Sequence, residues 1–299
     1  MKEKTLIVVT GPTGVGKTEA TLRLAEHFGV PVINADSRQI FAEIPIGTAA
    51  PTAAQQARVR HYFVGNHHLE DYYSASLFEE DVLKLINESS SKVSLLSGGS
   101  MMYIDAVCKG IDDIPTIHPE VRQEMMQLLE KEGLAKMCEL LHEWDPEHWA
   151  VVDRSNPRRV IHALEICKQT GRTYTSFRSN TIKERPFNII KIGLNRDRDT
   201  LYQRINQRVL QMIDDGMIEE AQRVYPKRML NSLNTVGYKE LFEYLDGLTT
   251  LDEAIFKIQS NTRRYARKQL TWYKRDQEMT WFSPDNIEEI LNYLYTISL

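Results

Sequence analysis

A phosphate-binding loop near the start of the chain constrains its fold more than any other feature. The loop matches the pattern G-x-x-x-x-G-K-[S/T] at every fixed position and consists of Gly11, Pro12, Thr13, Gly14, Val15, Gly16, Lys17 and Thr18. A β-branched run at 5–10 precedes it, and the apolar spacing of 18–28 predicts a helix after it. Backbone N–H groups then surround an anion, Lys17 adds positive charge, and the Thr18 hydroxyl suits Mg²⁺. The loop predicts binding of a di- or triphosphate, ATP included, without implying hydrolysis; the alternative is a chance Gly-rich turn.

Strand and helix patterns alternate around this loop. Strands are predicted at 5–10, 31–35, 61–64, 92–96 and 189–194, with helices at 18–28, 52–60 and 74–89. Only helices are predicted within 114–186, at 119–132, 134–144, 146–152 and 157–169, and helices are expected to finish the chain, at 199–214, 218–224, 238–244, 251–274 and 287–295. The sequence therefore predicts an α/β fold, a P-loop NTPase-like parallel sheet flanked by helices, with an all-helical insertion domain. The catalytic core is expected at 1–113 and 187–299 and the insertion at 114–186.

Composition excludes several classes of protein. The 37 Lys and Arg against 41 Asp and Glu give a net charge of −4, so any basic surface must be local. The three cysteines lack CxxC spacing, which argues against a zinc site or a disulfide framework and fits a reducing cytoplasm. No apolar run reaches the ~18 residues of a membrane span, and the N-terminal apolar stretch is interpreted as a strand rather than a signal peptide.

Polar residues follow two of the predicted strands at the edge where ligands bind in a parallel sheet. Asp36 follows 31–35, and three roles stay open for it: ligand of a metal or of a group that binds the metal, general base, or cap of the next turn. Ser37 and Gln39 offer hydrogen bonds to a nucleobase edge. The strand at 92–96 ends in Ser-Gly-Gly-Ser without an acid, unlike a hydrolysing P-loop protein, and Ser100 supplies a hydroxyl.

Basic residues cluster in the helical second half. Arg204 and Arg208 are four apart on a predicted helix, so one or both could clamp a diphosphate, unless they form a solvated face. The stretch 254–275 holds seven Lys or Arg and no acid, with aromatic residues between them, which is typical of an RNA-binding surface. A solvated helix face is the alternative. The pair His67-His68 favours a structural or substrate-loop role over a metal site, because adjacent side chains point apart.

An ordered set of motifs spans about residues 5–275. Besides the loop they are Asp36-Ser-Arg-Gln39, Gly47-Thr-Ala-Ala-Pro51, His67-His-Leu-Glu-Asp71, Gly98-Gly-Ser100, Asn156-Pro-Arg-Arg-Val160, Thr235-Val-Gly-Tyr-Lys-Glu-Leu241 and Arg267-Lys-Gln-Leu-Thr-Trp-Tyr-Lys274. The chain resembles the bacterial tRNA dimethylallyltransferases, also called tRNA isopentenyltransferases. The resemblance implies transfer, with Mg²⁺, of a dimethylallyl group from dimethylallyl diphosphate to the exocyclic N6 amine of the adenine immediately 3′ of the anticodon. That adenine must be flipped out of its stack.

The resemblance also implies roles for individual residues. Asp36 becomes the general base, Ser100 a contact of the amine, and Lys17, Thr18, Arg204 and Arg208 diphosphate ligands, with Mg²⁺ held through Thr18. The tRNA anticodon stem-loop would contact Asp36, Ser37, Arg38, Gln39, Ser100, Arg122, Arg158, Arg159, Val160, Ile161, His162, Asn234, Thr235, Val236, Gly237, Tyr238, Lys239, Arg267, Lys268, Gln269, Leu270, Thr271, Trp272, Tyr273 and Lys274. The chain departs from the usual pattern at Ser100-Met101-Met102, where the family has Thr-Gly-Leu, and at Ala50, where it often has Lys.

Three other functions are weighed against this one. An adenylate isopentenyltransferase acting on free AMP or ATP needs neither the helical insertion nor the basic stretch at 254–275. A P-loop small-molecule kinase would transfer the γ-phosphate of ATP, which labelled ATP would reveal. A noncatalytic RNA-binding protein has no use for a complete phosphate loop beside Asp36. The expected enzyme is a cytoplasmic monomer without membrane contact.

Overall fold

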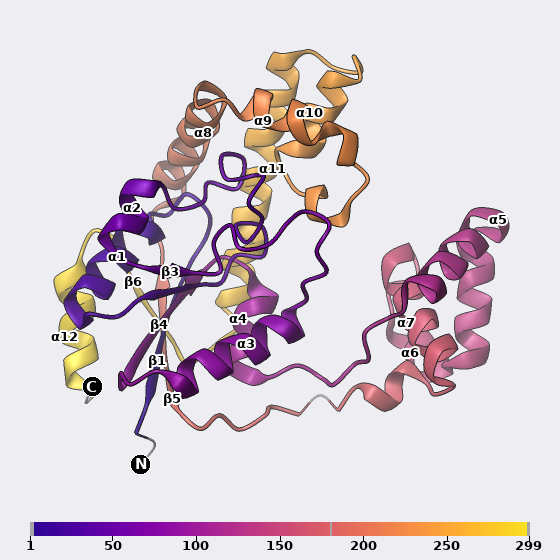
Figure 1. The fold of residues 1–299 in the computed structure, drawn as a ribbon, viewed down its shortest axis with the longest axis horizontal. Helices are drawn as coiled ribbons and strands as arrows, with labels where there is room; N and C mark the ends of the chain where they lie inside the picture. Colours follow the sequence, from indigo (N-terminus) through magenta and orange to yellow (C-terminus); the bar gives the residue numbers. More distant parts are fainter. Residues whose placement is uncertain (1–2, 180, 298–299) are drawn as a thin grey trace. The chain divides into compact units, whose positions relative to one another are not determined.

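The computed structural model describes residues 3–179 and 181–297, which form two compact units (Figure 1). The catalytic unit comprises the chain up to Lys109 and from Glu184 onward, and the helical unit is Gly110–Lys183. The boundaries expected from the sequence, 113/114 and 186/187, lie within a few residues of these. Residues 1–2, 180 and 298–299, which the expected domains include, lie outside the described residues.

A six-stranded parallel sheet forms the centre of the catalytic unit, in the order β3-β2-β4-β1-β5-β6. Its strands are β1 (Thr5–Thr10), β2 (Val32–Asn34), β3 (His61–Tyr62), β4 (Val93–Gly98), β5 (Asn188–Leu194) and β6 (Met279–Phe282). Thr10, the last residue of β1, pairs with Gly98 of β4 and Gly193 of β5, so three strands end together at one edge. This arrangement confirms the predicted α/β, P-loop-like fold.

Helices cover both faces of the sheet because successive β1 residues point to opposite sides. Ile7 and Val9 pack into a core with α1 (Lys17–Phe28) and α12 (Ile287–Thr296), whereas Leu6 and Val8 pack with α3 (Ala75–Glu88) and α4 (Met101–Lys109). Figure 1 shows α1 and α12 together at one side of the sheet and α3 with α4 at the other. A short helix, α2 (Ala53–Arg58), precedes β3.

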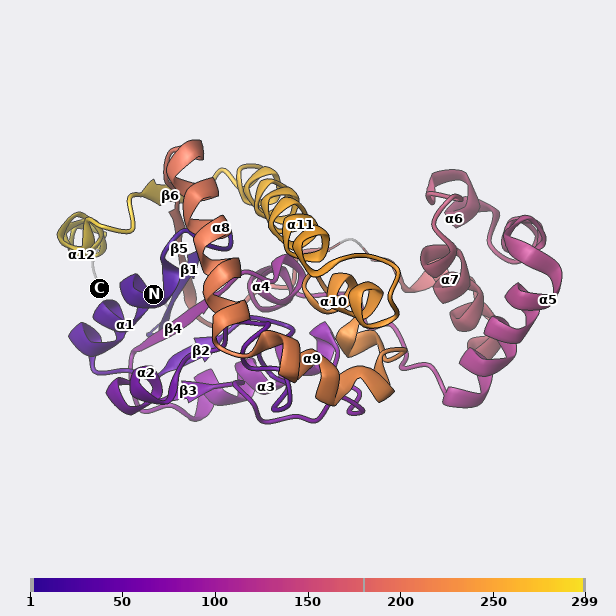
Figure 2. The same cartoon turned by 90° about the horizontal axis from the view of Figure 1, so that it is seen from above.

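A third core lies where the C-terminal helices meet the segment after β2. It is formed by α8 (Arg198–Asp214), α9 (Met217–Val224), α10 (Tyr238–Leu245) and α11 (Leu251–Tyr273), with two 3₁₀ turns at Tyr225–Lys227 and Asn231–Leu233. Figure 2 shows α9 and α10 beside one end of α11. Tyr238 is fully buried at the centre of this core.

The helical unit has a core of its own. Its elements are α5 (Pro119–Trp144), α6 (Pro146–Val151), α7 (Pro157–Thr170) and the 3₁₀ turn Tyr174–Phe177. Gly133 adopts φ 78° inside α5 and breaks its helical path between the two helices expected from the sequence. Met125, Met137, Leu141 and Leu164 are buried between α5 and α7.

Two elements differ from the sequence prediction. The expectation that only helices follow β5 is wrong, because β6 extends the sheet beside it. This edge strand has four residues, too few for a clear alternating pattern. The helix α4 was not predicted either, because the Gly-Gly-Ser turn before it indicated a loop.

Candidate active site

The phosphate loop joins β1 to α1 as the motif requires. Gly14 and Gly16 have φ of 80° and 109°, a backbone conformation that side chains strongly disfavour. A Cβ on Gly14 would lie 2.7 Å from Cγ1 of Ile205, so the loop packs directly on α8. Lys17 Nζ donates to the carbonyl oxygens of Gly11 and Pro12, each at 3.0 Å. The loop is thus a rigid turn with its lysine held across it.

Three arginines lie near this loop: Arg196 just before α8, and Arg204 and Arg208 within it. Arg204 Nε donates to Gly14 O at 3.0 Å, and Arg196 Nε donates to Val15 O at 2.7 Å. Arg208 donates to Ala49 O at 3.4 Å. Arg204 and Arg208 are expected at this site from the sequence, whereas Arg196 is not. The position of Arg196 shortly after β5, at the same sheet edge, could have predicted its place beside the loop. Its guanidinium also pairs with Asp285, which supports a structural role.

Positive charges crowd this site. Burial, and next the neighbouring Arg208, lower the pKa of Lys17 to about 8, against an opposing effect of Asp36. Burial also lowers the pKa of Arg208, with Asp36 opposing and Arg204 reinforcing the shift. Desolvation and mutual repulsion both disfavour the charged forms. An anion bound among these groups would relieve both, so the site suits a diphosphate.

Asp36 lies at the end of β2 beside these cations. Its Oδ1 accepts hydrogen bonds from the backbone N–H groups of Arg38 at 2.9 Å and Gln39 at 3.3 Å. Asp36 therefore caps the next turn, as one of its three expected roles requires. These hydrogen bonds orient its carboxylate and are compatible with a role as base or ligand. Gln39 uses its amide nitrogen on the carbonyls of Thr48 and Ala49, at 3.0 and 3.1 Å. Gln39 thereby holds the loop that Arg208 contacts.

Ser100 lies across from Asp36 because β2 and β4 end side by side. Its Oγ accepts the Ser37 backbone N–H at 2.8 Å and donates to Ser37 Oγ at 3.1 Å. A Cβ on Gly98 would come within 2.1 Å of Ala35 O, so only glycine permits this approach. Met101 in place of the family's usual glycine is the first residue of α4 and needs no special backbone conformation. Ser100 and Asp36 are thus brought to one place.

Basic side chains of α11 face two environments. Arg264, Arg267 and Lys268 are exposed, as are Thr271 and Lys274 just beyond. Arg263 is half-buried, and its guanidinium donates to Asn206 Oδ1 at 2.5 Å. Tyr265 lies close enough to Asp36 for burial and this carboxylate to raise the pKa of its phenol to about 12. The exposed side of α11 can therefore contact a polyanion.

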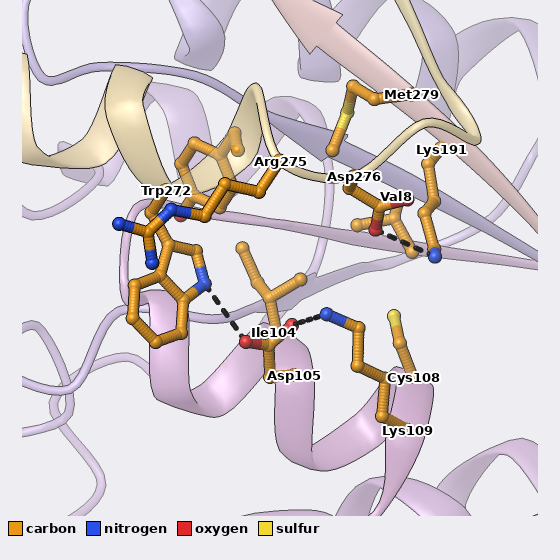
Figure 3. A pocket seen from close by; sticks show the side chains of 11 residues that line it. Val8, Ile104, Asp105, Cys108, Lys109, Lys191, Trp272, Arg275, Asp276 and Met279 are labelled. Carbon is orange, nitrogen blue, oxygen red and sulfur yellow. Dashed lines mark hydrogen bonds and ion pairs between the residues drawn. The ribbon is translucent and has the colours of Figure 1, made fainter. Parts of the chain in front are cut away.

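Several residues expected to contact tRNA are interior instead. Gln269 and Tyr273 are buried in α11, Leu270 is half-buried, and the indole N–H of Trp272 donates to Asp105 Oδ2 at 2.9 Å. Their side chains face the sheet and α4 because a helix turns its residues through all directions. Trp272 and Tyr273 line a cavity of about 140 Å³ with Cys108 of α4 and Lys191 of β5 (Figure 3). These side chains therefore have packing or hydrogen-bond partners within the protein, whereas their contact with tRNA stays a prediction.

The segment at 234–239 behaves similarly. Tyr238 is fully buried and its hydroxyl donates to Glu220, whose carboxylate also accepts the N–H groups of Ile46 at 2.9 Å and Gly47 at 2.7 Å. Gly237 is buried, Asn234, Thr235 and Val236 are half-buried, and Lys239 is exposed. The core of this motif therefore holds the loop before Thr48 rather than forming a surface.

In the helical unit the predicted set also divides by burial. Val160 and Ile161 belong to the core between α5 and α7, so their side chains do not offer an RNA surface. Arg158 and Arg159 are exposed at the start of α7. Arg122 donates to Glu165 Oε1 at 3.4 Å, and His162 lies 3.6 Å from the same carboxylate.

The histidine pair has structural partners. His67 lies 3.6 Å from Asp71 and packs against the ring of Tyr73, whereas His68 Nδ1 is 2.9 Å from Glu43. Among residues 3–179 and 181–297, no three His, Cys, Asp or Glu side chains form a metal-binding group. In the same part of the chain, no helix is long and apolar enough to cross a membrane.

Comparison with known proteins identifies relatives over nearly the whole chain. A family profile described as IPP transferase matches residues 39–276. The chain is 60% identical to tRNA dimethylallyltransferase 2 of Parabacteroides distasonis, covering 97% of each chain, and 59% identical to tRNA dimethylallyltransferase 1 of Phocaeicola vulgatus, covering 98% of this chain and 99% of that one.

Solved structures agree with these relatives. The crystal structure of a tRNA isopentenylpyrophosphate transferase from Bacillus halodurans is 36% identical, covers 99% of this chain and 96% of that one, and superposes with a TM-score of 0.71. A eukaryotic dimethylallyltransferase acting on tRNA superposes with a TM-score of 0.78 at 24% identity, over 94% of this chain and 74% of that one, which shows the shared fold.

Proposed function

The chain belongs to the tRNA dimethylallyltransferase family and is a prenyltransferase that transfers a dimethylallyl group to tRNA, and from this premise we propose its donor, acceptor and catalytic residues. The donor is dimethylallyl diphosphate, bound by the phosphate loop. The acceptor is the exocyclic N6 amine of the adenine immediately 3′ of the anticodon. The enzyme acts as a monomer, because one chain supplies both the donor-site and the acceptor-site residues, and it acts in the cytoplasm, where it meets tRNA.

The observation that carries this proposal is the proximity of a carboxylate to the phosphate loop. Asp36 acts electrostatically on Lys17 and on Arg208. Its backbone hydrogen bonds fix its turn, and Ser100 is tied to the adjacent Ser37. A leaving diphosphate and an incoming amine therefore have ligands within one site, which is the geometry that group transfer requires.

The chain's own groups account for the transfer. The bond between the allylic carbon and the diphosphate oxygen breaks, and the electron pair leaves with the diphosphate. Loop N–H groups, Lys17 and Arg208 stabilise the growing negative charge, and Arg204, which donates to Gly14 O of the loop, adds to them. The adenine amine forms the new C–N bond and loses its proton to the Asp36 carboxylate, because its lone pair is too delocalised to attack unaided. The Ser100 hydroxyl contacts the amine and orients it.

Mg²⁺ fits this site through oxygen ligands. Thr18 is exposed at the first turn of α1 and offers a hydroxyl, and a diphosphate supplies further hard oxygen atoms. When bound, the ion would neutralise charge on the departing diphosphate. Thr18 is the residue of this chain that would hold it.

The tRNA surface is proposed to include the exposed cations of both units. In the catalytic unit these are Arg264, Arg267, Lys268 and Lys274; in the helical unit they are Arg158 and Arg159. Guanidinium and ammonium groups contact backbone phosphates, which positions the anticodon loop without reading its sequence. Tyr265, whose side chain is partly buried near Asp36 and 37% exposed, offers an aromatic face to an unstacked base.

Incubation of the protein with unmodified tRNA, dimethylallyl diphosphate and Mg²⁺, followed by nucleoside mass analysis, tests the proposal. The expected product is dimethylallylated adenosine at the position 3′ of the anticodon. Modification of free AMP in preference to tRNA would contradict the acceptor, and transfer of label from γ-labelled ATP would contradict the donor. A tRNA in which guanosine replaces that adenosine serves as the matched control and should remain unmodified.

A further inference from the structure

One buried amide connects the donor loop to the acceptor side of the site. Gln269 of α11 is only 1% exposed. Its Oε1 accepts the backbone N–H of Thr13 in the phosphate loop at 2.9 Å, and its Nε2 donates to Gly99 O at 2.7 Å. Gly99 immediately precedes Ser100, so a single side chain spans the two loops.

Only a side-chain amide satisfies both partners. The Thr13 N–H requires an acceptor and the Gly99 carbonyl requires a donor, and the amide offers one of each on adjacent atoms. A carboxylate would place a second acceptor against Gly99 O, and an apolar side chain would leave both backbone groups unpaired in a buried site. The two hydrogen bonds also fix which way the amide points.

The space around Gly99 is matched to this amide. A Cβ on Gly99 would lie 2.6 Å from Gln269 Nε2 and 3.8 Å from Lys17 Nζ. Glycine at 99 therefore lets the amide reach the carbonyl while the lysine passes beside it. Since the obstructing atom is the end of a side chain, alanine at 99 would displace the amide without disturbing the strand.

We propose that Gln269 is a positioning residue that sets the phosphate loop against the Gly99-Ser100 turn, and so fixes the donor diphosphate relative to the acceptor amine. The inference rests on the proposed function and deepens it. It replaces the tRNA contact expected for Gln269, whose neighbours Arg267 and Lys268 face solvent while its own amide faces inward. Misplacement of either loop weakens both diphosphate binding and chemistry.

The test compares Gln269→Met, which keeps the volume and removes both hydrogen bonds, with Gly99→Ala, which displaces the same amide. Gln259→Met is the matched control, because that amide on the same helix donates to Asn206 O, at 3.2 Å. Three quantities are measured: the Kd for inorganic diphosphate, kcat with tRNA, and the Kd for tRNA. Gln269→Met should raise the diphosphate Kd and lower kcat by about tenfold or more each. The tRNA Kd should stay within about twofold of the wild-type value, and Gln259→Met should resemble the wild type.

A variant that carries both Gln269→Met and Gly99→Ala shows whether the two substitutions act through the same amide or independently. If both substitutions act through one amide, Gly99→Ala should add little to Gln269→Met, whereas additive effects would overturn the proposal. A weaker tRNA affinity with an unchanged diphosphate Kd would make Gln269 an RNA contact and overturn it. A lower Tm with unchanged kinetics would leave only a packing role and overturn it as well. Should Gln269→Met not fold, the kinetics of Gly99→Ala decide. Wild-type protein that binds diphosphate but does not modify tRNA would contradict the proposed function instead.

Discussion

Lys17 is buried next to the guanidinium of Arg208, and burial first and the repulsion by Arg208 second lower the pKa of Lys17 to about 8. Asp36 partly compensates for it by its opposite charge. The ammonium form of Lys17 is thus less favourable in the free protein than in water. A diphosphate between these groups restores that form, so donor binding is coupled to the protonation of Lys17.

Donor affinity should therefore fall as the pH rises through about 8. Below that pH, Lys17 is already protonated and adds no pH dependence of its own. Above it, a growing share of Lys17 is neutral and must take up a proton on binding, so the Kd for inorganic diphosphate rises toward about tenfold per pH unit. Titration calorimetry from pH 7 to 9.5 measures this slope. Lys17→Arg keeps its charge over the whole range, so the pH dependence that remains in this variant belongs to the diphosphate itself, and the wild type should show a steeper slope. A similar slope in both proteins would exclude Lys17 as the titrating group.

Arg208→Gln should also change the pH dependence of the Kd for inorganic diphosphate. Loss of the guanidinium removes the repulsion, so the break in diphosphate affinity should move to higher pH. The affinity at pH 7 should weaken by about tenfold or more, as expected for one hydrogen bond to a charged group. Arg204→Gln is the matched comparison, because Arg204 donates to Gly14 O and is not among the groups that shift Lys17. If both variants gave the same break, Arg208 would have no special place beside Lys17.

The sequence predicts the fold and the catalytic edge because these depend on local patterns. The loop 11–18 has a fixed spacing, and Asp36 follows a strand whose end position is set by the parallel sheet. The burial of Gln269 and Tyr238 and the partial burial of Trp272 were not predictable in this way. Each is polar or amphipathic, and its direction depends on how α10 and α11 pack against distant segments.

The spacing of a motif also does not distinguish residues that face solvent from residues that face the protein interior. Arg267 and Gln269 stand two positions apart in one motif, yet one faces solvent and the other holds the phosphate loop. The missed strand β6 has the same cause, since its four residues gain their conformation by pairing with β5. The sequence did not show which way a side chain points, or which strand a short segment pairs with, once the elements pack together.

Tyr238→Phe should destabilise the catalytic unit. The phenol is buried against the Glu220 carboxylate, which also binds the N–H groups of Ile46 and Gly47. Removing the hydroxyl leaves a buried charge with one partner fewer, at a cost of about 1–3 kcal/mol in the free energy of unfolding. Urea denaturation measures it, with the exposed Tyr72→Phe as control, for which a change within about 0.5 kcal/mol is expected. An unchanged unfolding free energy would contradict the role of this hydrogen bond.

Substitution of Arg264, Arg267 and Lys268 together by glutamine should weaken tRNA binding and spare diphosphate binding. All three are exposed on α11, whereas Arg263 is tied to Asn206. Each lost phosphate contact should lower the salt dependence of log K by about 0.7, and about one to three contacts are expected. Binding at several salt concentrations measures the slope, and Lys84→Gln on α3 provides an exposed control. Parallel slopes with equal affinities would make this face of α11 merely solvated.

Asp36→Asn removes the proposed general base and keeps the hydrogen bonds of the turn in which it lies. Asparagine keeps an oxygen that can accept the N–H groups of Arg38 and Gln39, so the loop geometry should persist. It cannot take up the amine proton, so single-turnover transfer to tRNA should slow by ~10²-fold or more. Well below the pKa of Lys17, where this lysine stays charged without the help of Asp36, diphosphate should bind about as well as to the wild type, because the ligands from the loop and α8 are unchanged. Asp252→Asn, an exposed carboxylate in the first turn of α11, should leave both quantities at wild-type levels. If the Asp36 variant instead turned over at the wild-type rate, the proton would have to leave by another route and Asp36 would be only the cap that its hydrogen bonds describe.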